Sequence, residues 1–125
     1  VILSFYNLGM SSECASQLLL NLKAEGLQPQ FTFNAANFAG AGEKPFLFSY
    51  KQKLRRFVDQ LDIEDACFDG TPCSLACGNA EIKEMISILR AAGFGGYCVL
   101  ARANRQAGNT LQESVAQIEK LLNHM

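Results

Sequence analysis

The sequence has no excess of positive charge and no long apolar run. Its 11 lysines and arginines are balanced by 12 aspartates and glutamates, for a formal net charge of −1. Proteins that bind nucleic acid or anionic membranes favour a basic face, so this balance argues against both partners. No apolar stretch is long enough to span a bilayer, and the chain does not open on the basic segment of a signal peptide. We therefore expect a cytoplasmic protein with no nucleic-acid or membrane partner.

The chain also lacks the cysteine and histidine spacings of structural metal sites. It has five cysteines, no Cys-x-x-Cys pair, and His124 as its only histidine. An odd cysteine count without paired spacing argues against a disulfide scaffold and for a reducing compartment. Cys67, Cys73 and Cys77 lie close in sequence, which leaves zinc as an alternative, but structural zinc ligands usually form tighter pairs. We interpret these residues as buried or loop thiols.

The composition is that of one packed domain. Hydrophobic residues make up 49% of the 125 residues and charged residues 18%, so a core can form and disorder is not expected. We treat residues 1–125 as a single domain. The chain begins without Met and opens directly into an apolar run, from which we expect that it was cut from a longer parent.

An apolar run, a polar turn and a helix-period segment follow one another four times along the chain. The expected strands are Val1–Asn7, Gln30–Asn34, Val58–Glu64 and Tyr97–Ala101. Long loops are expected after the second and third strands, at Ala35–Lys44 and Ala66–Gly78. Strand–helix alternation predicts parallel strands joined by right-handed crossovers.

Each expected helix has a start signal and an apolar stripe. The start signals are Ser11 or Ser12, Pro45, Asn79, and Thr110 with Glu113 as a capping box. Gly26 is expected to end the first helix and Gly93 the third. The expected buried stripes are Leu18, Leu19 and Leu22; Phe46, Tyr50, Leu54 and Phe57; Ile82, Met85, Ile86 and Leu89; and Leu111, Val115, Ile118 and Leu122.

Strand parity favours a barrel arc over a small open sheet with helices on both faces. Phe31 and Phe33 share one strand face, whereas Thr32 and Asn34 share the other. Strands of a doubly wound sheet are apolar on both faces, whereas barrel enzymes hold their sites at the strand tops. We therefore predict an α/β fold of four βα units with parallel strands, half of a TIM (β/α)8 barrel.

Three stretches of the chain carry a family resemblance. They are Phe33–Phe38 followed by Gly42–Pro45, then Leu61–Ala66, then Ile82–Leu100. In order, they are similar to an Asp-Pro-Ala-Asn-Phe segment with Gly-Glu-x-Pro, to Val-His-Val-Lys-Asp-Ala, and to a closing Gly-Tyr-Asp-Gly with its final strand. The chain thus resembles the C-terminal half of xylose-isomerase-like sugar phosphate isomerases and epimerases, a family that includes the family 2 AP endonucleases. The resemblance implies units five to eight of an eight-unit barrel.

The resemblance also implies a divalent-metal site, from which this chain departs. The family's four ligand positions fall on Tyr6, Asn34, Asp62 and Ala101. Only Asp62 keeps a charged oxygen, and Asn34 offers a neutral carbonyl, whereas hard cations need several oxygen ligands. We expect no resident cofactor, with Mn, Mg or Zn held by Asp62 and Asn34 as the alternative. The family's two acid–base glutamates are also missing, so we do not expect its standard isomerase mechanism.

Four further side chains are candidates for substrate binding. Asn34 and Asn37 can orient sugar hydroxyls, with loop capping as the alternative. Arg102 and Arg105 follow the last strand, where barrels often seat phosphate, with surface charge as the alternative.

Asp62 and Glu64 are two residues apart on a strand and share a face, so they form a candidate catalytic carboxylate pair. The alternative is polar filling of a barrel top.

Two functions stay open: a sugar or sugar-phosphate isomerase-like part that is inactive alone or altered in chemistry, and a non-catalytic binding or scaffold domain. The two outer strands would leave unpaired edges, which predicts self-association as a dimer or completion by a missing N-terminal half.

Overall fold

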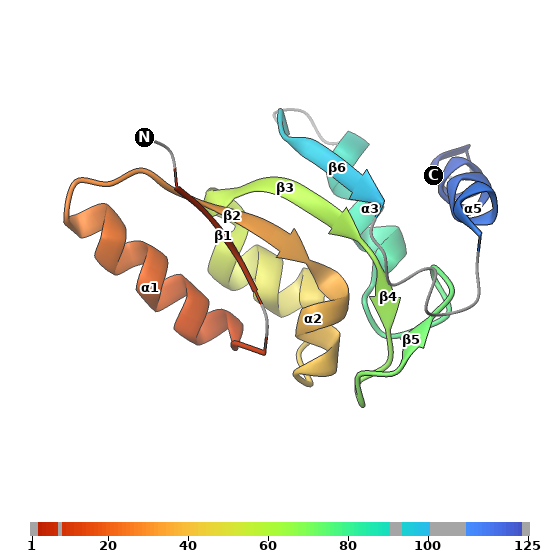
Figure 1. Ribbon diagram of the computed structural model, residues 1–125, viewed down its shortest axis with the longest axis horizontal. Coiled ribbons are helices and arrows are strands. Elements are labelled where there is room, and N and C mark those ends of the chain that lie inside the picture. The colour runs from red at the N-terminus through yellow and green to blue at the C-terminus, as the bar shows by residue number, and fades with distance from the viewer. Residues whose placement is uncertain (1–2, 8, 91–93, 101–109, 124–125) are drawn as a thin grey trace.

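The centre of the protein is a parallel sheet of four strands (Figure 1). The computed structural model describes residues 3–7, 9–90, 94–100 and 110–123. The sheet strands are β1 (Leu3–Tyr6), β2 (Pro29–Asn34), β3 (Val58–Ile63) and β6 (Tyr97–Leu100). They lie in the sheet in the order in which they occur in the chain, and every neighbouring pair is parallel. The predicted α/β class, the four strands and their parallel pairing are confirmed.

Helices and one short hairpin connect these strands, and one further helix, α5, follows the last of them. The helices are α1 (Ser12–Ala24), α2 (Ala35–Gly40), the π-helix η1 (Pro45–Leu54), the 3₁₀ turn η2 (Arg55–Phe57), α3 (Ile82–Arg90) and α5 (Leu111–Asn123). The hairpin pairs β4 (Asp65–Ala66) with β5 (Pro72–Cys73) in antiparallel fashion. No helix among the described residues is both long enough and apolar enough to cross a membrane.

The two faces of the sheet differ in chemistry. Because paired residues of parallel strands point to the same side, the pairs Phe5–Phe31, Phe33–Leu61 and Ile63–Leu100 form apolar rows on one face. This face packs against the helices to form the core. The other face carries the pairs Tyr6–Thr32 and Asn34–Asp62. The alternation of apolar and polar faces is as predicted.

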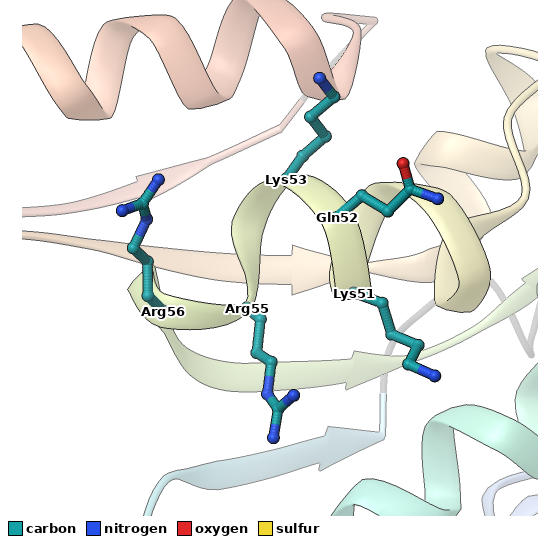
Figure 2. Close-up of a pocket in the computed structure, with 5 residues that line it drawn as sticks. All are labelled: Lys51, Gln52, Lys53, Arg55 and Arg56. Atoms are coloured by element: carbon teal, nitrogen blue, oxygen red, sulfur yellow. The ribbon is translucent and has the colours of Figure 1, made fainter.

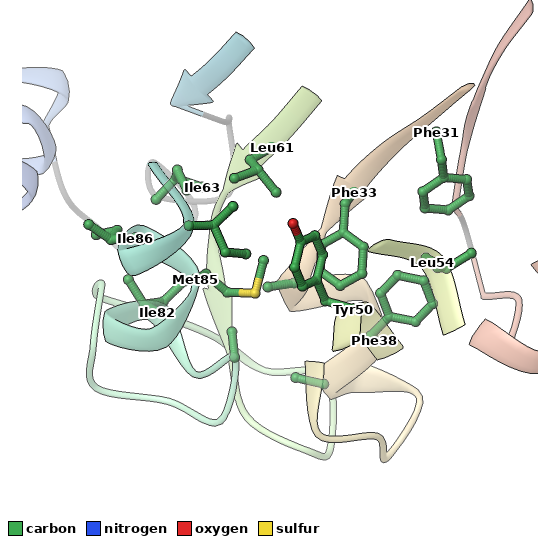
Figure 3. Packing of buried hydrophobic residues seen from close by; sticks show 14 of the residues in the cluster. Phe31, Phe33, Phe38, Tyr50, Leu54, Leu61, Ile63, Ile82, Met85 and Ile86 are labelled. Carbon is green, nitrogen blue, oxygen red and sulfur yellow. The ribbon is translucent and has the colours of Figure 1, made fainter. Parts of the chain in front are cut away.

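Aromatic rings form the part of the core between β2, α2 and η1 (Figure 3). The ring of Phe33 lies 4.9 Å from that of Phe38 and 5.7 Å from that of Tyr50, measured between centroids. Phe33 and Phe38 are fully buried. Aromatic pairs at such separations stabilise a core by about 1 kcal/mol beyond the burial of their area. The predicted stripe of the second helix therefore faces this cluster.

Glu43 joins α1 to η1. Its carboxylate accepts hydrogen bonds from the backbone N–H of Ser12 at 3.0 Å, from the Ser12 hydroxyl, and from the Ser49 hydroxyl at 2.8 Å. Both serines are buried. A carboxylate at the first turn of a helix also interacts favourably with the helix dipole. The family-like Gly-Glu-Lys-Pro stretch thus has a structural role in this chain.

Three of the predicted helix start signals are confirmed. The Ser11 hydroxyl accepts a hydrogen bond from the N–H of Cys14, and Pro45 occupies the first turn of η1. The Thr110 hydroxyl accepts from the N–H of Glu113 at 3.1 Å. Gly26, with φ +85°, follows the end of α1 as predicted.

Three other local predictions are wrong. The segment after β2 was expected to be a loop, yet Ala35–Gly40 forms α2, because the Asn34 side chain caps it and alanines favour helix. The segment after β3 contains the β4–β5 hairpin. Asn79 does not cap α3, because its side-chain oxygen instead accepts the N–H of Phe68 at 3.0 Å.

Three positions of the predicted stripes are exposed. Leu18, Leu111 and Val115 are 38%, 63% and 41% exposed, so their assignment to the core is wrong. The stripe of α3 is buried at Ile82, Met85 and Ile86. Gly93 and the side chain of Leu89 lie outside the described residues.

Candidate functional site

A hydrogen-bond network connects β1, β2 and α2 at the carboxyl ends of the two strands. Asn34 is the last residue of β2 and the N-cap of α2, and its side-chain oxygen accepts from the N–H of Asn37 at 3.2 Å. This bond orients the Asn34 amide so that Nδ2 donates to the Tyr6 hydroxyl at 3.1 Å. Asn37 Nδ2 donates to the same hydroxyl at 3.3 Å and to the carbonyl oxygen of Asn7 at 2.5 Å. Asn34 is fully buried and caps α2, as the local-capping alternative predicted, and Asn37 is held by the same network.

Tyr6 is the centre of this network. Its oxygen accepts two amide hydrogens, so its own O–H is left to donate outward. Burial raises the pKa of Tyr6 above 10.0; the hydrogen bond from Asn37 opposes this, and the charges of Glu64 and Asp62 add to it. The phenol is therefore protonated throughout the neutral range, and the residue is 45% exposed.

Asp62 and Glu64 bring negative charge to the same side of the sheet. Asp62 pairs in register with Asn34, and its Oδ1 accepts from Gln60 Nε2 at 2.9 Å. Both carboxylates act on the Tyr6 hydroxyl through space, so the predicted acidic pair belongs to the same site as the asparagines. The sequence had assigned Tyr6 only as a poor metal ligand. Its role as the shared acceptor depends on the parallel pairing of β1 with β2, which brings Tyr6 beside Asn34 and Asn37.

The site combines a hydroxyl donor with carboxylate acceptors on the polar face of the sheet. Vicinal hydroxyl groups of a sugar offer both a donor and an acceptor at each oxygen, which matches this set. Within residues 3–7, 9–90, 94–100 and 110–123, no group of three or more His, Cys, Asp or Glu side chains is arranged to hold a metal ion. Ala101, Arg102 and Arg105 lie outside the described residues, and so does the phosphate-binding site predicted at the two arginines.

A second polar centre, the Asp65 carboxylate, organises the loop between β3 and α3. The buried Asp65 carboxylate accepts three backbone N–H groups: those of Ala66 at 2.8 Å, Gly78 at 3.0 Å and Ala80 at 3.1 Å. Asp65 was not among the predicted site residues. The only sequence signal for it was its place in the family-like stretch.

The five cysteines, including the three in this loop, are free thiols. Cys73 packs so closely on Gly78 that a Cβ added there would lie 2.4 Å from its sulfur. Burial raises the pKa of the Cys73 thiol to about 12, and the negative charge of Asp65 adds to the shift. Cys73 is therefore a packed thiol, in agreement with the predicted loop thiols.

We expect Cys73 to resist alkylation. At pH 8 its thiolate fraction is very small, and the thiolate is the reactive form. Peptide mass spectrometry after timed exposure to iodoacetamide should show modification of Cys73 at least about tenfold slower than that of the exposed Cys14 and Cys77. Its rate should rise as the pH approaches 12. Equal rates at the three positions would contradict the packing of Cys73 against Gly78.

No protein-family model, no curated protein and no solved structure matches this chain significantly.

Proposed function

We propose that this chain is a sugar- or sugar-phosphate-binding half of a TIM-type barrel, related to isomerases and epimerases but with the metal and acid–base residues largely replaced. The observation that carries the proposal is the Tyr6–Asn34–Asn37 network beside Asp62 and Glu64. It stands at the carboxyl ends of parallel strands, where barrel enzymes hold their substrates.

The described strand ends favour binding over metal-dependent isomerisation. Tyr6, Asn34 and Asp62 supply a phenol that keeps its proton, an amide and one carboxylate. Hard divalent cations prefer several charged oxygen ligands, so this set is poorly suited to them. The same groups suit neutral hydroxyls, since the phenol donates and the carboxylates accept. Asp62 and Glu64 remain the residues that we propose for proton transfer if the site has altered chemistry.

The arrangement of strands supports the barrel part of the proposal. Strand order follows chain order, and the apolar face of the sheet packs against the helices as one core. A doubly wound sheet instead reverses its strand order and carries helices on both faces. The remaining strands of a ring would come from a second copy or from a longer chain. Light scattering would separate these, because self-association predicts twice the 13.7 kDa of one chain.

Replacing Tyr6 with phenylalanine should weaken sugar binding by about five- to tenfold, because one net hydrogen bond contributes about 1 kcal/mol. Calorimetric titration of sugars and sugar phosphates into the wild-type chain first identifies a ligand, and the variant is then titrated with it. The O–H persists up to its raised pKa, so the affinity should be constant from pH 6 to 9 as far as Tyr6 is concerned.

The matched control is Tyr97→Phe, which removes a hydroxyl from a tyrosine that is 76% exposed on β6. This variant should bind like the wild type. If no sugar or sugar phosphate binds saturably, the proposed function is wrong. Equal losses of affinity in the two variants would mean that sugar binding does not depend on the Tyr6 network.

A further inference from the structure

Positive charge is concentrated at the end of η1, within a chain whose net charge is −1. The segment from Lys51 to Arg56 contains four cations. Lys53 forms an ion pair with Glu13 of α1, with Nζ and Oε2 2.5 Å apart. The other three, Lys51, Arg55 and Arg56, have no carboxylate partner among the residues that the structure describes. Favourable interaction with the helix dipole accounts for cations near this end, but not for the direction in which each side chain extends.

Lys51 and Arg55 extend toward the lower side of η1 in the view, whereas Lys53 extends upward toward α1 and Arg56 also extends upward, opposite to Arg55 (Figure 2). On that side lies a groove between η1 and α3. Its remaining lining residues are Phe46, Tyr50, Ser87 and Ile88. Two cations thus line a groove whose other walls come from two different helices.

The floor of this groove is apolar and preformed. The rings of Phe46 and Tyr50 stack with an interplanar angle of 11°, their centroids 6.2 Å apart. The Lys51 ammonium lies 5.5 Å from the centroid of Phe46. Tyr50 and Ile88 are buried, which fixes the base of the groove. A ligand here would meet apolar surface below and positive charge along one rim.

We propose that this groove docks an acidic, amphipathic segment of a partner protein, with apolar side chains against the partly exposed Phe46 and carboxylates against Lys51 and Arg55. Charge complementarity is the reason for choosing an acidic partner, because Lys51 and Arg55 have no carboxylate partner among the described residues. Helical segments commonly bind apolar grooves in this way, with charged residues fixing their direction.

The groove has a volume of about 160 Å³, and Lys51 and Arg55 also line a second hollow of about 430 Å³ together with Gln52, Lys53 and Arg56 (Figure 2). The burial of the aromatic floor of the groove argues against nucleic acid as its ligand. Single-stranded nucleic acid stacks bases on exposed aromatic faces along a basic track, but Tyr50 is only 7% exposed. The groove lies on the helix side of the sheet and does not involve Tyr6 or Asp62, so this inference is independent of the proposed sugar site.

The test compares neighbouring arginines. A fluorescently labelled helical peptide, with leucines on one face and glutamates flanking them, is titrated with the full chain while anisotropy is recorded. Arg55→Glu should weaken binding by about tenfold or more, because it places a like charge in the groove. Arg56→Glu makes the same charge change outside the groove and should weaken binding by less than about threefold. Binding should also weaken as salt is raised.

Two further probes make the outcome decisive. A peptide with serines in place of leucines should not bind, and a single-stranded oligonucleotide should not displace the original peptide. Equal effects of Arg55→Glu and Arg56→Glu would reduce the groove to diffuse surface charge and overturn the proposal. Displacement by the oligonucleotide, or no binding of the acidic peptide at low salt, would also overturn it. Circular dichroism of both variants establishes that each is folded.

Discussion

Replacing Gly96 with alanine is expected to destabilise the protein by about 3 kcal/mol or more, at the upper end for overpacking of a well-packed region. A Cβ at Gly96 would lie 2.0 Å from the carbonyl oxygen of Asp59 and 2.7 Å from its carbonyl carbon. These are backbone atoms of β3 itself, one residue before Gln60, which pairs with Tyr97 of β6. They cannot move without breaking the register of the two strands. The start of β6 would have to separate from β3.

Gly95 provides a control one residue away. A Cβ at Gly95 would meet no atom within 4 Å, so Gly95→Ala should change stability little. Urea unfolding followed by circular dichroism measures the difference between the two variants. A loss of comparable size in both would indicate that lost backbone flexibility, rather than contact with Asp59, is responsible. An unaffected Gly96→Ala would contradict the close approach of β6 to β3.

Sequence patterns predicted the parts of the fold that depend on near neighbours in the chain. Apolar alternation located all four sheet strands, and short-range capping identified Ser11, Pro45 and Thr110. The helix α2 was missed because the whole of Ala35–Lys44 was interpreted as a loop. Gly42 has a positive φ of +83° and lies beyond the end of that helix, whereas Gly40 is its last residue. The turn therefore begins after Gly40, and the residues before it are helical.

The site was predicted in its parts and not in its connections. Asn34, Asn37 and Asp62 were all named as candidate site residues, and the structure groups them on one side of the sheet. The central position of Tyr6 depends on bonds to residues 28 and 31 positions away. Periodicity along one segment contains no information on such pairs. The role of Asp65 was missed for the same reason, because two of its three donors are 13 and 15 residues away.

Those distant donors make Asp65→Ala the second substitution with a large expected effect. Asp65 is 1% exposed, and its removal would leave the N–H groups of Ala66, Gly78 and Ala80 without an acceptor. A buried donor without a partner costs about 1–3 kcal/mol. Because solvent can reach part of the loop after the change, we expect a total loss of about 3–5 kcal/mol. Urea unfolding measures this loss of stability.

Asp69 is the matched control, because it is an aspartate of the same loop that also accepts a backbone N–H, that of Thr71 at 2.9 Å, but is exposed. Water can replace its carboxylate, so Asp69→Ala should have a small effect. The loss of stability in Asp65→Asn should lie between those of Asp65→Ala and Asp69→Ala. One oxygen remains as an acceptor, but the amide nitrogen faces a backbone N–H donor. Amide hydrogen exchange should rise selectively at Gly78 and Ala80 in both Asp65 variants. Unchanged exchange at these amides would contradict the role of Asp65 as the acceptor that holds the loop between β3 and α3.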